Sequence, residues 1–321
     1  MIKIREEAFR YYFYFMQERM DIFWNKYDGK TPLYSNDLIL SQYKFTNVYR
    51  ACDRVSQYLI SNVIYTDGKN YSPEDIVFRI LLFKIFNRIE TWQFLEKHYG
   101  SINIKAFKHK DFSSILRHRI QKQPIFSAAY LMNGTHVKYN DKFKYKHEKW
   151  LCMLDDEIIK GKLIDKIIAA RSLEEIYELL LTCSFIGPFL AYQFAIDLNY
   201  SEVINFDENS FVKAGIGAIR GIDKCFINKA GKSYEYLIEY TFENIDKYRT
   251  KFNYSFQNLF GRNPTLIDLQ NCFCETDKYL RVALPELNIR TKRIKQKYKQ
   301  VLKPINYFFP PKWELENIKE V

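Results

Sequence analysis

The chain has 321 residues, 47% of them hydrophobic, so it is long enough to bury a core and too apolar to be disordered. Its 11 glycines and 9 prolines are too few for the frequent turns of an all-β protein, and no repeated unit of fixed period occurs. The 49 Lys and Arg outnumber the 38 Asp and Glu, for a net charge of +11, which favours a polyanionic partner. We therefore expect a globular, mostly helical protein that binds nucleic acid.

The cysteines and the start of the chain bear on the compartment. The N-terminus has no apolar run typical of an export signal, and the most apolar stretch, 76–86, is interrupted by Arg79 and Lys84. The six cysteines and five histidines show no metal-ligand spacing. We predict free thiols, no zinc or other metal, no cofactor, and a cytoplasmic location.

Apolar residues recur at helical spacing along the first half of the chain. The pattern predicts helices over 3–26, 43–60, 76–87 and 90–99. Ser72 and Pro73 are typical of a helix start, because the serine hydroxyl caps a free amide and proline fits the first turn. Within 43–60, Arg50, Asp53 and Arg54 share a polar face, which is either a solvated surface with ion pairs or a binding surface.

Two segments are strongly basic. Residues 105–122 hold six Lys or Arg and one Asp, and Lys alternates with aromatic residues over 138–150. The whole segment 105–150 is therefore either a nucleic-acid face or a lysine-coated surface over an aromatic core. Residues 290–303 hold seven cations and no acid, and we expect them, Lys292 and Arg293 included, to add to DNA affinity.

Residues 172–199 predict a helix, a short turn and a second helix. Ser172 caps the first helix, and Gly187 with Pro188 ends the turn before the second helix begins. The backbone amides of 184–187 would then face outward at a helix start, where they could hold a phosphate. An apolar stretch follows and leads to Asp207 and Glu208, ahead of a helix expected over 208–214.

This order of elements resembles the helix-hairpin-helix superfamily of DNA glycosylases. Asp207 follows Gly187 by 20 residues, the position that the catalytic Asp has in that family. Phe185 stands where the family has the first hairpin glycine. Phe189 stands where its bifunctional members carry a nucleophilic lysine, so the resemblance implies a monofunctional enzyme.

Four motifs resemble the alpha-glutamyl/putrescinyl-thymine pyrophosphorylase family. They are FTNVYRACDR at 45–54, GPFLAYQ at 187–193, GIGAIRGIDKCF at 215–226 and QNCFCETDKY at 270–279. That family is related to the helix-hairpin-helix glycosylases and to phage hydroxymethyluracil-DNA kinases, and bacterial defence relatives are similar to base-excising glycosylases. The resemblance implies double-stranded DNA carrying modified bases as the partner.

Two of these motifs have more than one interpretation. The glycines of 215–221 indicate either a turn lining a phosphate or base pocket or a plain structural turn. Glu275 and Asp277 fall on a helix predicted to begin near 264–265, where a separation of two residues turns their side chains about 200° apart. We therefore expect separate partners: Lys278 or Tyr279 for Glu275, and Arg281 for Asp277.

Together these patterns predict an all-α, helix-hairpin-helix DNA-glycosylase-like fold with two helical lobes, 1–150 and 151–321, and a basic cleft. The leading hypothesis is a monofunctional DNA glycosylase that flips out and excises a bulky base, such as glucosylated hydroxymethylcytosine, from phage DNA in antiviral defence. One alternative is a base-hypermodification transferase that displaces pyrophosphate from an activated hydroxymethyl-pyrimidine in DNA. A non-enzymatic DNA-binding protein is the other.

The leading hypothesis divides the candidate residues into three groups. A catalytic carboxylate would stabilise the oxocarbenium ion, cations and amides would hold the strand, and the remaining residues would contact the base. The catalytic candidates are Asp207, Glu208 and Asp277. The DNA-binding candidates are Arg50, Arg54, Ser184, Phe185, Ile186, Gly187, Arg220, Lys292 and Arg293. The base-pocket candidates are Asp53, Tyr192, Gln193 and Glu275.

Overall fold

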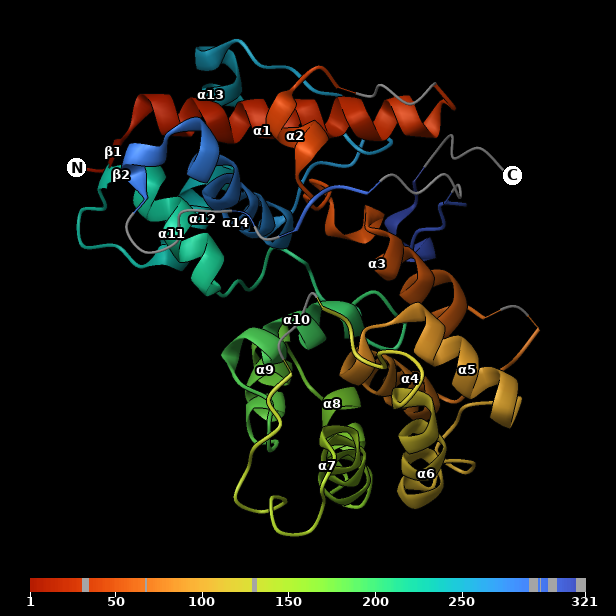
Figure 1. The fold of residues 1–321 in the computed structure, drawn as a ribbon. Coiled ribbons are helices and arrows are strands. Elements are labelled where there is room, and N and C mark those ends of the chain that lie inside the picture. Colours follow the sequence, from red (N-terminus) through yellow and green to blue (C-terminus); the bar gives the residue numbers. More distant parts are fainter. Residues whose placement is uncertain are drawn as a thin grey trace. The chain divides into compact units, whose positions relative to one another are not determined.

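The computed structural model describes residues 1–30, 35–66, 68–128, 132–288, 294, 296–299 and 305–315. These residues are mostly helical, which confirms the predicted all-α class (Figure 1). One small antiparallel sheet pairs β1 (Lys3–Ile4) with β2 (Phe226–Asn228). In the described parts of the chain, none of the helices is both long enough and apolar enough to span a bilayer.

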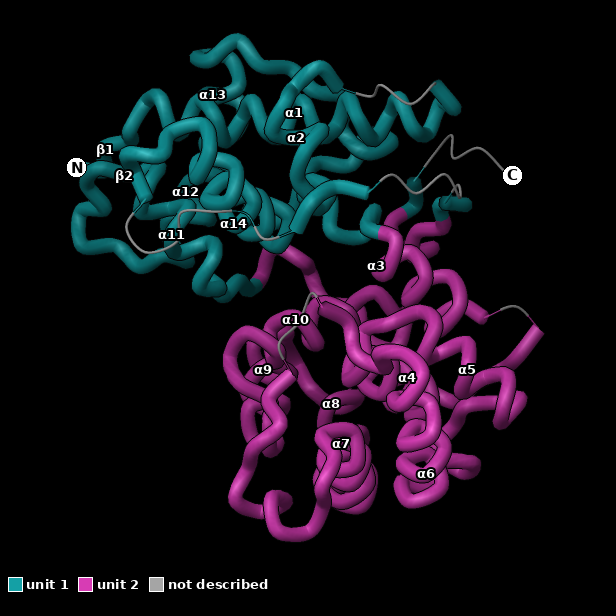
Figure 2. Tube along the Cα trace, in the orientation of Figure 1, with its two compact units in different colours: residues 1–53, 211–307, 314–321 teal, residues 54–210, 308–313 magenta. Residues whose placement is uncertain are grey.

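Two compact units make up the chain (Figure 2). Unit 1 comprises 1–53, 211–307 and 314–321, and unit 2 comprises 54–210 and 308–313. Both units are discontinuous in sequence, whereas the sequence pattern placed a single division at residue 150. The two predicted lobes and the basic cleft stay predictions.

Unit 1 is organised around one long helix. Its elements are α1 (Glu6–Tyr27), α2 (Leu38–Gln42), η1 (Arg50–Cys52), α11 (Ile216–Cys225), α12 (Tyr234–Glu243), α13 (Ile245–Phe252), α14 (Leu266–Ala283) and η4 (Pro285–Leu287). Helix α14 packs against α1, α11 and α12, beside which it lies in Figure 1. The buried rings of Tyr12 and Phe273 lie 4.3 Å apart between α1 and α14, and aromatic packing of this kind supplies much of the core.

The start of α14 follows the sequence signal at 264–265. The Thr265 hydroxyl and the Asp268 carboxylate form a reciprocal capping box, which satisfies amides that the first turn leaves free. A second oxygen of Asp268 accepts the backbone amide of Arg50, at 2.9 Å. The cap therefore also anchors η1 to the start of α14.

Helix α11 lies against α14 because two of its glycines leave room for the neighbouring backbone. A Cβ at Gly221 would collide with the carbonyl oxygen of Phe273, and one at Gly217 would collide with the sulfur of Cys274. The two glycines are four residues apart and so lie on the same face of α11. The pocket-lining turn predicted over 215–221 is therefore wrong: from Ile216 onward the segment is helix, and its glycines serve helix packing.

Unit 2 contains the hairpin segment and the remaining helices of the described chain. Its elements are α3 (Arg54–Tyr58), η2 (Leu59–Ile64), α4 (Pro73–Phe86), α5 (Ile89–Tyr99), α6 (His109–Ile120), α7 (Lys146–Met153), η3 (Leu154–Ile159), α8 (Leu163–Ile168), α9 (Leu173–Leu181), α10 (Pro188–Leu198) and η5 (Pro311–Trp313). Helix α4 is buried along nearly its whole length and begins at the predicted Ser72 cap. A buried ion pair joins it to α10, with Lys84 Nζ 2.9 Å from an Asp197 oxygen.

The helix predicted over 43–60 is wrong in its first half. Residues 45–49 are irregular, and helical structure begins only with η1 and continues through α3 and η2. The Asp53 carboxylate accepts both the backbone amide and the side-chain amide of Asn47, at 2.9 and 3.0 Å. Asn and Asp side chains compete with helical hydrogen bonds in this way, and here the local loop is the outcome.

The α11–α14 contact predicts a position-specific effect of adding one methyl group. Gly221→Ala should destabilise the protein by roughly 1–3 kcal/mol, because the backbone of Phe273 must move to admit the Cβ. Gly187→Ala is the matched control, since no atom lies within 4 Å of its added Cβ and its φ is −90°. Thermal and urea unfolding of both variants measure the difference, and equal stabilities would contradict the packing role of Gly221.

Candidate functional site

Helix α14 presents two carboxylates on different sides. Lys278 Nζ lies 2.7 Å from Glu275, and Arg281 lies 2.6 Å from Asp277, which confirms the predicted ion pairs. Glu275 also accepts the backbone amide of Thr46, at 3.0 Å, whereas Asp277 faces α11. The two acidic residues therefore belong to separate clusters.

Three cations converge on the carboxylate of Asp277, which is 1% exposed. Arg220 Nε and Lys224 Nζ of α11 lie 3.1 and 3.0 Å from its oxygens, opposite Arg281 of α14. Burial alone would favour the protonated acid, but the hydrogen bond from Arg281 and the charge of Lys224 lower the pKa of Asp277. Because three positive charges surround one negative charge, the cluster keeps a net positive charge.

Lys224 and Arg220 differ in burial and in the number of contacts that they make with the protein. Lys224 is 7% exposed and its ammonium also bonds the backbone carbonyl of Asp277 and the side chain of Asn288, so it is part of the interior. Burial lowers the pKa of Lys224, against the opposing charge of Asp277. The Arg220 side chain is 38% exposed and reaches Asp277 through Nε.

The terminal nitrogens of Arg220 make no hydrogen bond to other described residues, while Nε keeps the guanidinium in place. A guanidinium fixed in this way presents two parallel donors, the geometry that binds a phosphate or carboxylate in bidentate fashion. We call Arg220, Lys224, Asp277 and Arg281 the cation cluster. Its chemistry suits an anion, and a phosphate above all.

The other side of α14 holds the loop at 45–53. Asn271 donates to Thr46 Oγ1 and to the Asn47 carbonyl, at 3.0 and 3.2 Å. Arg19 of α1 donates to the Asn47 side chain, at 2.9 Å, and Asn47 in turn holds Asp53. Burial raises the pKa of Asp53 to about 6, although the Asn47 amide and the charge of Arg19 both lower it. These contacts fix the loop to α1 and α14.

The hairpin of unit 2 has the predicted order of α9, turn and α10, but the amides of Ser184 and Ile186 bond to other groups of the protein. The Ser184 amide and hydroxyl donate to Glu157, at 2.7 and 2.8 Å, and Tyr139 and Lys138 donate to the same carboxylate. Burial favours the protonated form of Glu157, but the hydrogen bonds from Lys138 and Ser184 lower its pKa. The predicted phosphate site at 184–187 is therefore wrong for Ser184, because a protein carboxylate already occupies the position of the phosphate.

Phe185 explains how the hairpin dispenses with its first glycine. Its φ is +69°, the left-handed conformation that glycine adopts without strain. The ring is buried against Trp150, Tyr139 and His136, at centroid distances of 5.2, 5.4 and 5.3 Å. Aromatic packing of this extent offsets a backbone strain that costs on the order of 1 kcal/mol.

Asp207 and Glu208 do not start a helix. Residues 208–214 form a turn and an irregular segment, and Asp207 is exposed, with its carboxylate accepting the amide of Asn209 at 2.9 Å. Glu208 accepts the indole N–H of Trp313, at 2.7 Å. The predicted helix over 208–214 is therefore wrong, because the Asp207 side chain closes a local turn instead of capping a helix.

The remaining candidates lie in several places. Arg50 is buried, Arg54 opens α3, and Tyr192 and Gln193 are buried on α10. Ile186 is buried and Gly187 precedes α10. Lys292 and Arg293 lie outside the described residues. All six cysteines are free thiols, as predicted, and among the described residues no group of three or more His, Cys, Asp or Glu could hold a metal.

Sequence reasoning missed several members of these clusters. Lys224 lies in the quoted motif at 215–226, beyond the turn predicted over 215–221, and only the helical geometry of α11 brings it one turn after Arg220, beside Asp277. Glu157 lay in an acidic run with no sign of its partner 27 residues later. Asn47 lay within a quoted motif, and its spacing of six residues from Asp53 was the signal that could have indicated a local loop.

The fold is all-α, and its helix pair α11–α14 carries the cation cluster around Asp277. The chain belongs to the family described as "5-hmdU DNA kinase, helical domain", whose model matches residues 6–289. It is similar to the 5-hmdU DNA kinase of Bacillus phage SP10, with 23% identity over 93% of this chain and 49% of that protein. The chain thus spans about half the length of the curated relative it matches. No solved structure matches it.

These comparisons overturn the leading hypothesis from the sequence. The hydrolytic glycosylase activity, the roles of Asp207 and Glu208 in it and its place in antiviral defence are wrong, because the family and the relative are named for DNA kinases. The resemblance between one hairpin and the glycosylases spans some fifty residues, whereas the family model covers most of the chain. The transferase alternative fits these findings better.

The raised pKa of Asp53 predicts a pH-dependent effect on stability. Its folded-state pKa of about 6 lies above the ordinary value of 3.8, so the native state holds a proton that the unfolded state releases. The contribution of protonated Asp53 to the free energy of unfolding is therefore complete below about pH 4, and it is lost as the pH rises through about 6. Asp53→Asn keeps an oxygen that can accept from Asn47 but cannot ionise.

The variant should therefore be more stable than the wild type at pH 7, by roughly 1–3 kcal/mol, and the difference should vanish near pH 4. Urea unfolding at pH 4, 5, 6 and 7 measures it. The exposed Asp141→Asn variant serves as the control and should follow the wild type at each pH. A stability difference for Asp53→Asn that does not change with pH would contradict the assignment.

Proposed function

We propose that this chain is the helical part of a transferase that modifies the hydroxymethyl group of a pyrimidine in DNA. The support is the match of residues 6–289 to the family model, together with the printed activity of the phage relative, which is a 5-hmdU DNA kinase. DNA carrying modified bases is then the substrate.

The observation that carries the proposal is the meeting of three family-like motifs on α14. The motif at 270–279 supplies Asp277, and that at 215–226 supplies Arg220 and Lys224. The motif at 45–54 is fixed to the same helix through Thr46 and Asn271. The motifs at 215–226 and 270–279 thus build one positively charged site, whose chemistry suits a phosphate group, and the motif at 45–54 is held on the other side of the same helix.

In a phosphoryl transfer, the hydroxymethyl oxygen forms a bond to phosphorus as the bond to the leaving nucleotide oxygen breaks. The proton of the hydroxyl group is released, and negative charge spreads over the transferred oxygens. Arg220 would bind those oxygens with its terminal nitrogens. Asp277 is a positioning residue in this proposal, because it acts through the guanidinium that it holds.

The resemblance to the pyrophosphorylase family favours a second candidate. There, pyrophosphate already attached to the hydroxymethyl carbon leaves when an amine forms the new bond. The cation cluster would bind the departing pyrophosphate, so both reactions place a phosphate at the same residues. The two differ in the product, which gains a phosphate in one and an amine in the other.

The test is a product analysis on duplex DNA containing 5-hydroxymethyluracil, incubated with ATP and Mg²⁺ and digested to nucleosides for mass spectrometry. Phosphoryl transfer predicts a nucleoside heavier by one phosphate, and the matched thymine duplex should stay unchanged. For the second candidate, duplex carrying the pyrophosphorylated base is incubated with putrescine and should gain the amine. Neither product, together with equal affinity for modified and unmodified duplex, would contradict the proposal.

Arg220→Gln should lower the rate of product formation about 10²- to 10³-fold, the effect of removing one donor that stabilises charge in a transition state. The fold should survive, because Lys224 and Arg281 still compensate Asp277. Lys247→Gln is the matched control, an exposed cation on α13 of the same unit. Equal rates for the two variants would exclude Arg220 from the site.

A further inference from the structure

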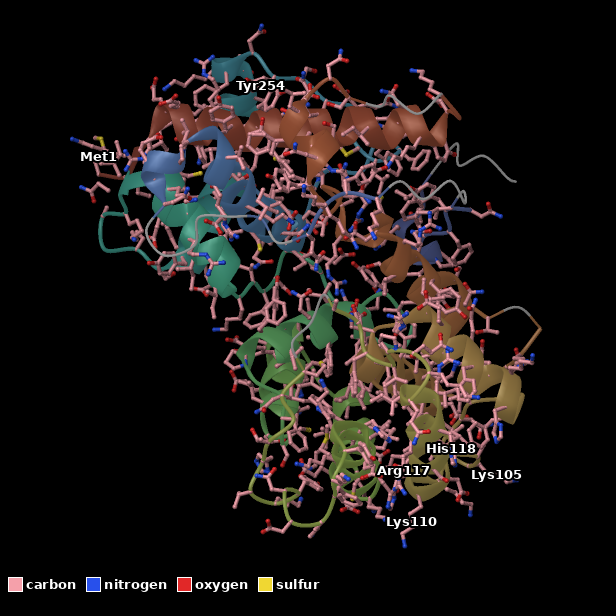
Figure 3. All side chains as sticks on the ribbon, viewed as in Figure 1. Met1, Lys105, Lys110, Arg117, His118 and Tyr254 are labelled. Atoms are coloured by element: carbon pink, nitrogen blue, oxygen red, sulfur yellow. The ribbon has the colours of Figure 1, made fainter. Side chains whose placement is uncertain are left out.

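Helix α6 and the residues that flank it expose several cations on the surface of unit 2. Its inner side buries Phe112, Ser113 and Leu116, the spacing of an amphipathic helix. Its outer side carries Lys110, Ser114, Arg117, His118 and Gln121, all exposed. In Figure 3 the labelled side chains of Lys105, Lys110, Arg117 and His118 gather around this helix.

Two cations of this segment are held in place by the protein. Arg119 donates to the Glu90 carbonyl, at 2.6 Å, and lies over the ring of Phe94. Arg117 pairs with the buried Glu148, yet its side chain is 51% exposed. These contacts fix the position of α6 without covering its outer side.

Four lysines of this segment are not held in this way. All four are exposed, and their side chains form no ion pair or hydrogen bond with the described residues. They are Lys105, Lys108, Lys110 and Lys122. Asp111 is the one acid in 105–122, so their charge is largely uncompensated. We call these four lysines, with Arg117 and His118, the α6 surface.

An aromatic ring continues this surface onto the neighbouring helix. Helix α6 packs against α7, and Tyr145 immediately precedes α7. Arg117 and Lys144 lie over the Tyr145 ring, at 5.7 and 5.6 Å from its centroid. The ring therefore orients two exposed cations in the same region.

We propose that the α6 surface binds the sugar–phosphate backbone of duplex DNA. Its side chains are nearly all hydrogen-bond donors, which matches a ligand whose outer atoms are acceptors. From Lys110 to Arg117 the helix rises about 10 Å, which spans about three base pairs of a duplex. A membrane surface fits less well, because Ile120, 37% exposed, is the one large apolar side chain exposed on α6.

This inference goes beyond the transferase proposal, because backbone binding does not depend on the modified base. The α6 surface belongs to unit 2, whereas the cation cluster belongs to unit 1. Each can therefore be tested while the other is intact, and failure of either leaves the other standing.

The test measures binding of an unmodified 20-base-pair duplex by fluorescence anisotropy between 50 and 200 mM NaCl, for the full chain. The test variant carries Lys105→Gln, Lys108→Gln, Lys110→Gln and Lys122→Gln. The slope of log affinity against log salt should flatten by about 0.9 for each phosphate that the variant no longer neutralises, hence by at least about 2 for three or four phosphates. The affinity itself should fall more than tenfold at the lowest salt.

The matched control removes the same number of charges elsewhere, with Lys3→Gln, Lys166→Gln, Lys232→Gln and Lys247→Gln, all exposed. It should keep nearly the wild-type slope. If both quadruple variants weaken binding equally, net charge accounts for the effect and the surface assignment is wrong. A double variant, Lys105→Gln with Lys110→Gln, gives the same comparison at half the charge change should the quadruple variant unfold.

Competition with poly-L-glutamate decides between a duplex and an acidic protein as the occupant. At equal concentrations of negative charge, unlabelled duplex should displace the bound duplex far better than the polypeptide does. Equal displacement would mean that the surface binds any polyanion of the same charge, whatever its geometry, and it would overturn the DNA assignment.

Discussion

The carboxylate of Asp277 joins the two helices on which the rest of unit 1 is assembled. It is almost fully buried and accepts contacts from two cations of α11 and one of its own helix, α14. A buried charge is tolerated only when it is paired and hydrogen-bonded, and leaving such a charge without any partner costs about 3–5 kcal/mol. The close approach of α11, which Gly221 permits, is what brings these groups into range. Packing and electrostatics at this helix pair therefore depend on each other.

The surplus of positive charge at this pair links the fold to the proposed chemistry. Two cations already over-compensate one carboxylate, and Arg220 is a third. Arg220 contacts Asp277 through Nε, so its two terminal nitrogens can donate to another anion. Phosphate transfer and pyrophosphate displacement both need such donors, whereas excision of a base by a carboxylate does not. The hairpin in unit 2, on which the glycosylase hypothesis rested, instead closes on the protein's own Glu157.

Sequence patterns predicted what depends on local chemistry. Three helices begin at the expected N-terminal caps, which are Ser72, Ser172 and Thr265. Such a cap depends only on residues within one helical turn. The opposite directions of Glu275 and Asp277 follow from helical geometry alone. Contacts between distant segments were not predictable: a glycine pair in 215–221 fits a turn as well as a packed helix until α14 is known to lie against it. The position of Asp207 misled for the same reason, because its spacing from Gly187 says nothing about the turn that it forms.

Isothermal calorimetry of inorganic pyrophosphate titrated into the protein measures anion binding at the cation cluster without any reaction. We expect a binding site on the wild type, an affinity at least tenfold lower for Arg220→Gln, and an unchanged affinity for Lys247→Gln. An affinity that Arg220→Gln leaves unchanged, or no binding to the wild type, would contradict the assignment of the cation cluster as the phosphate site.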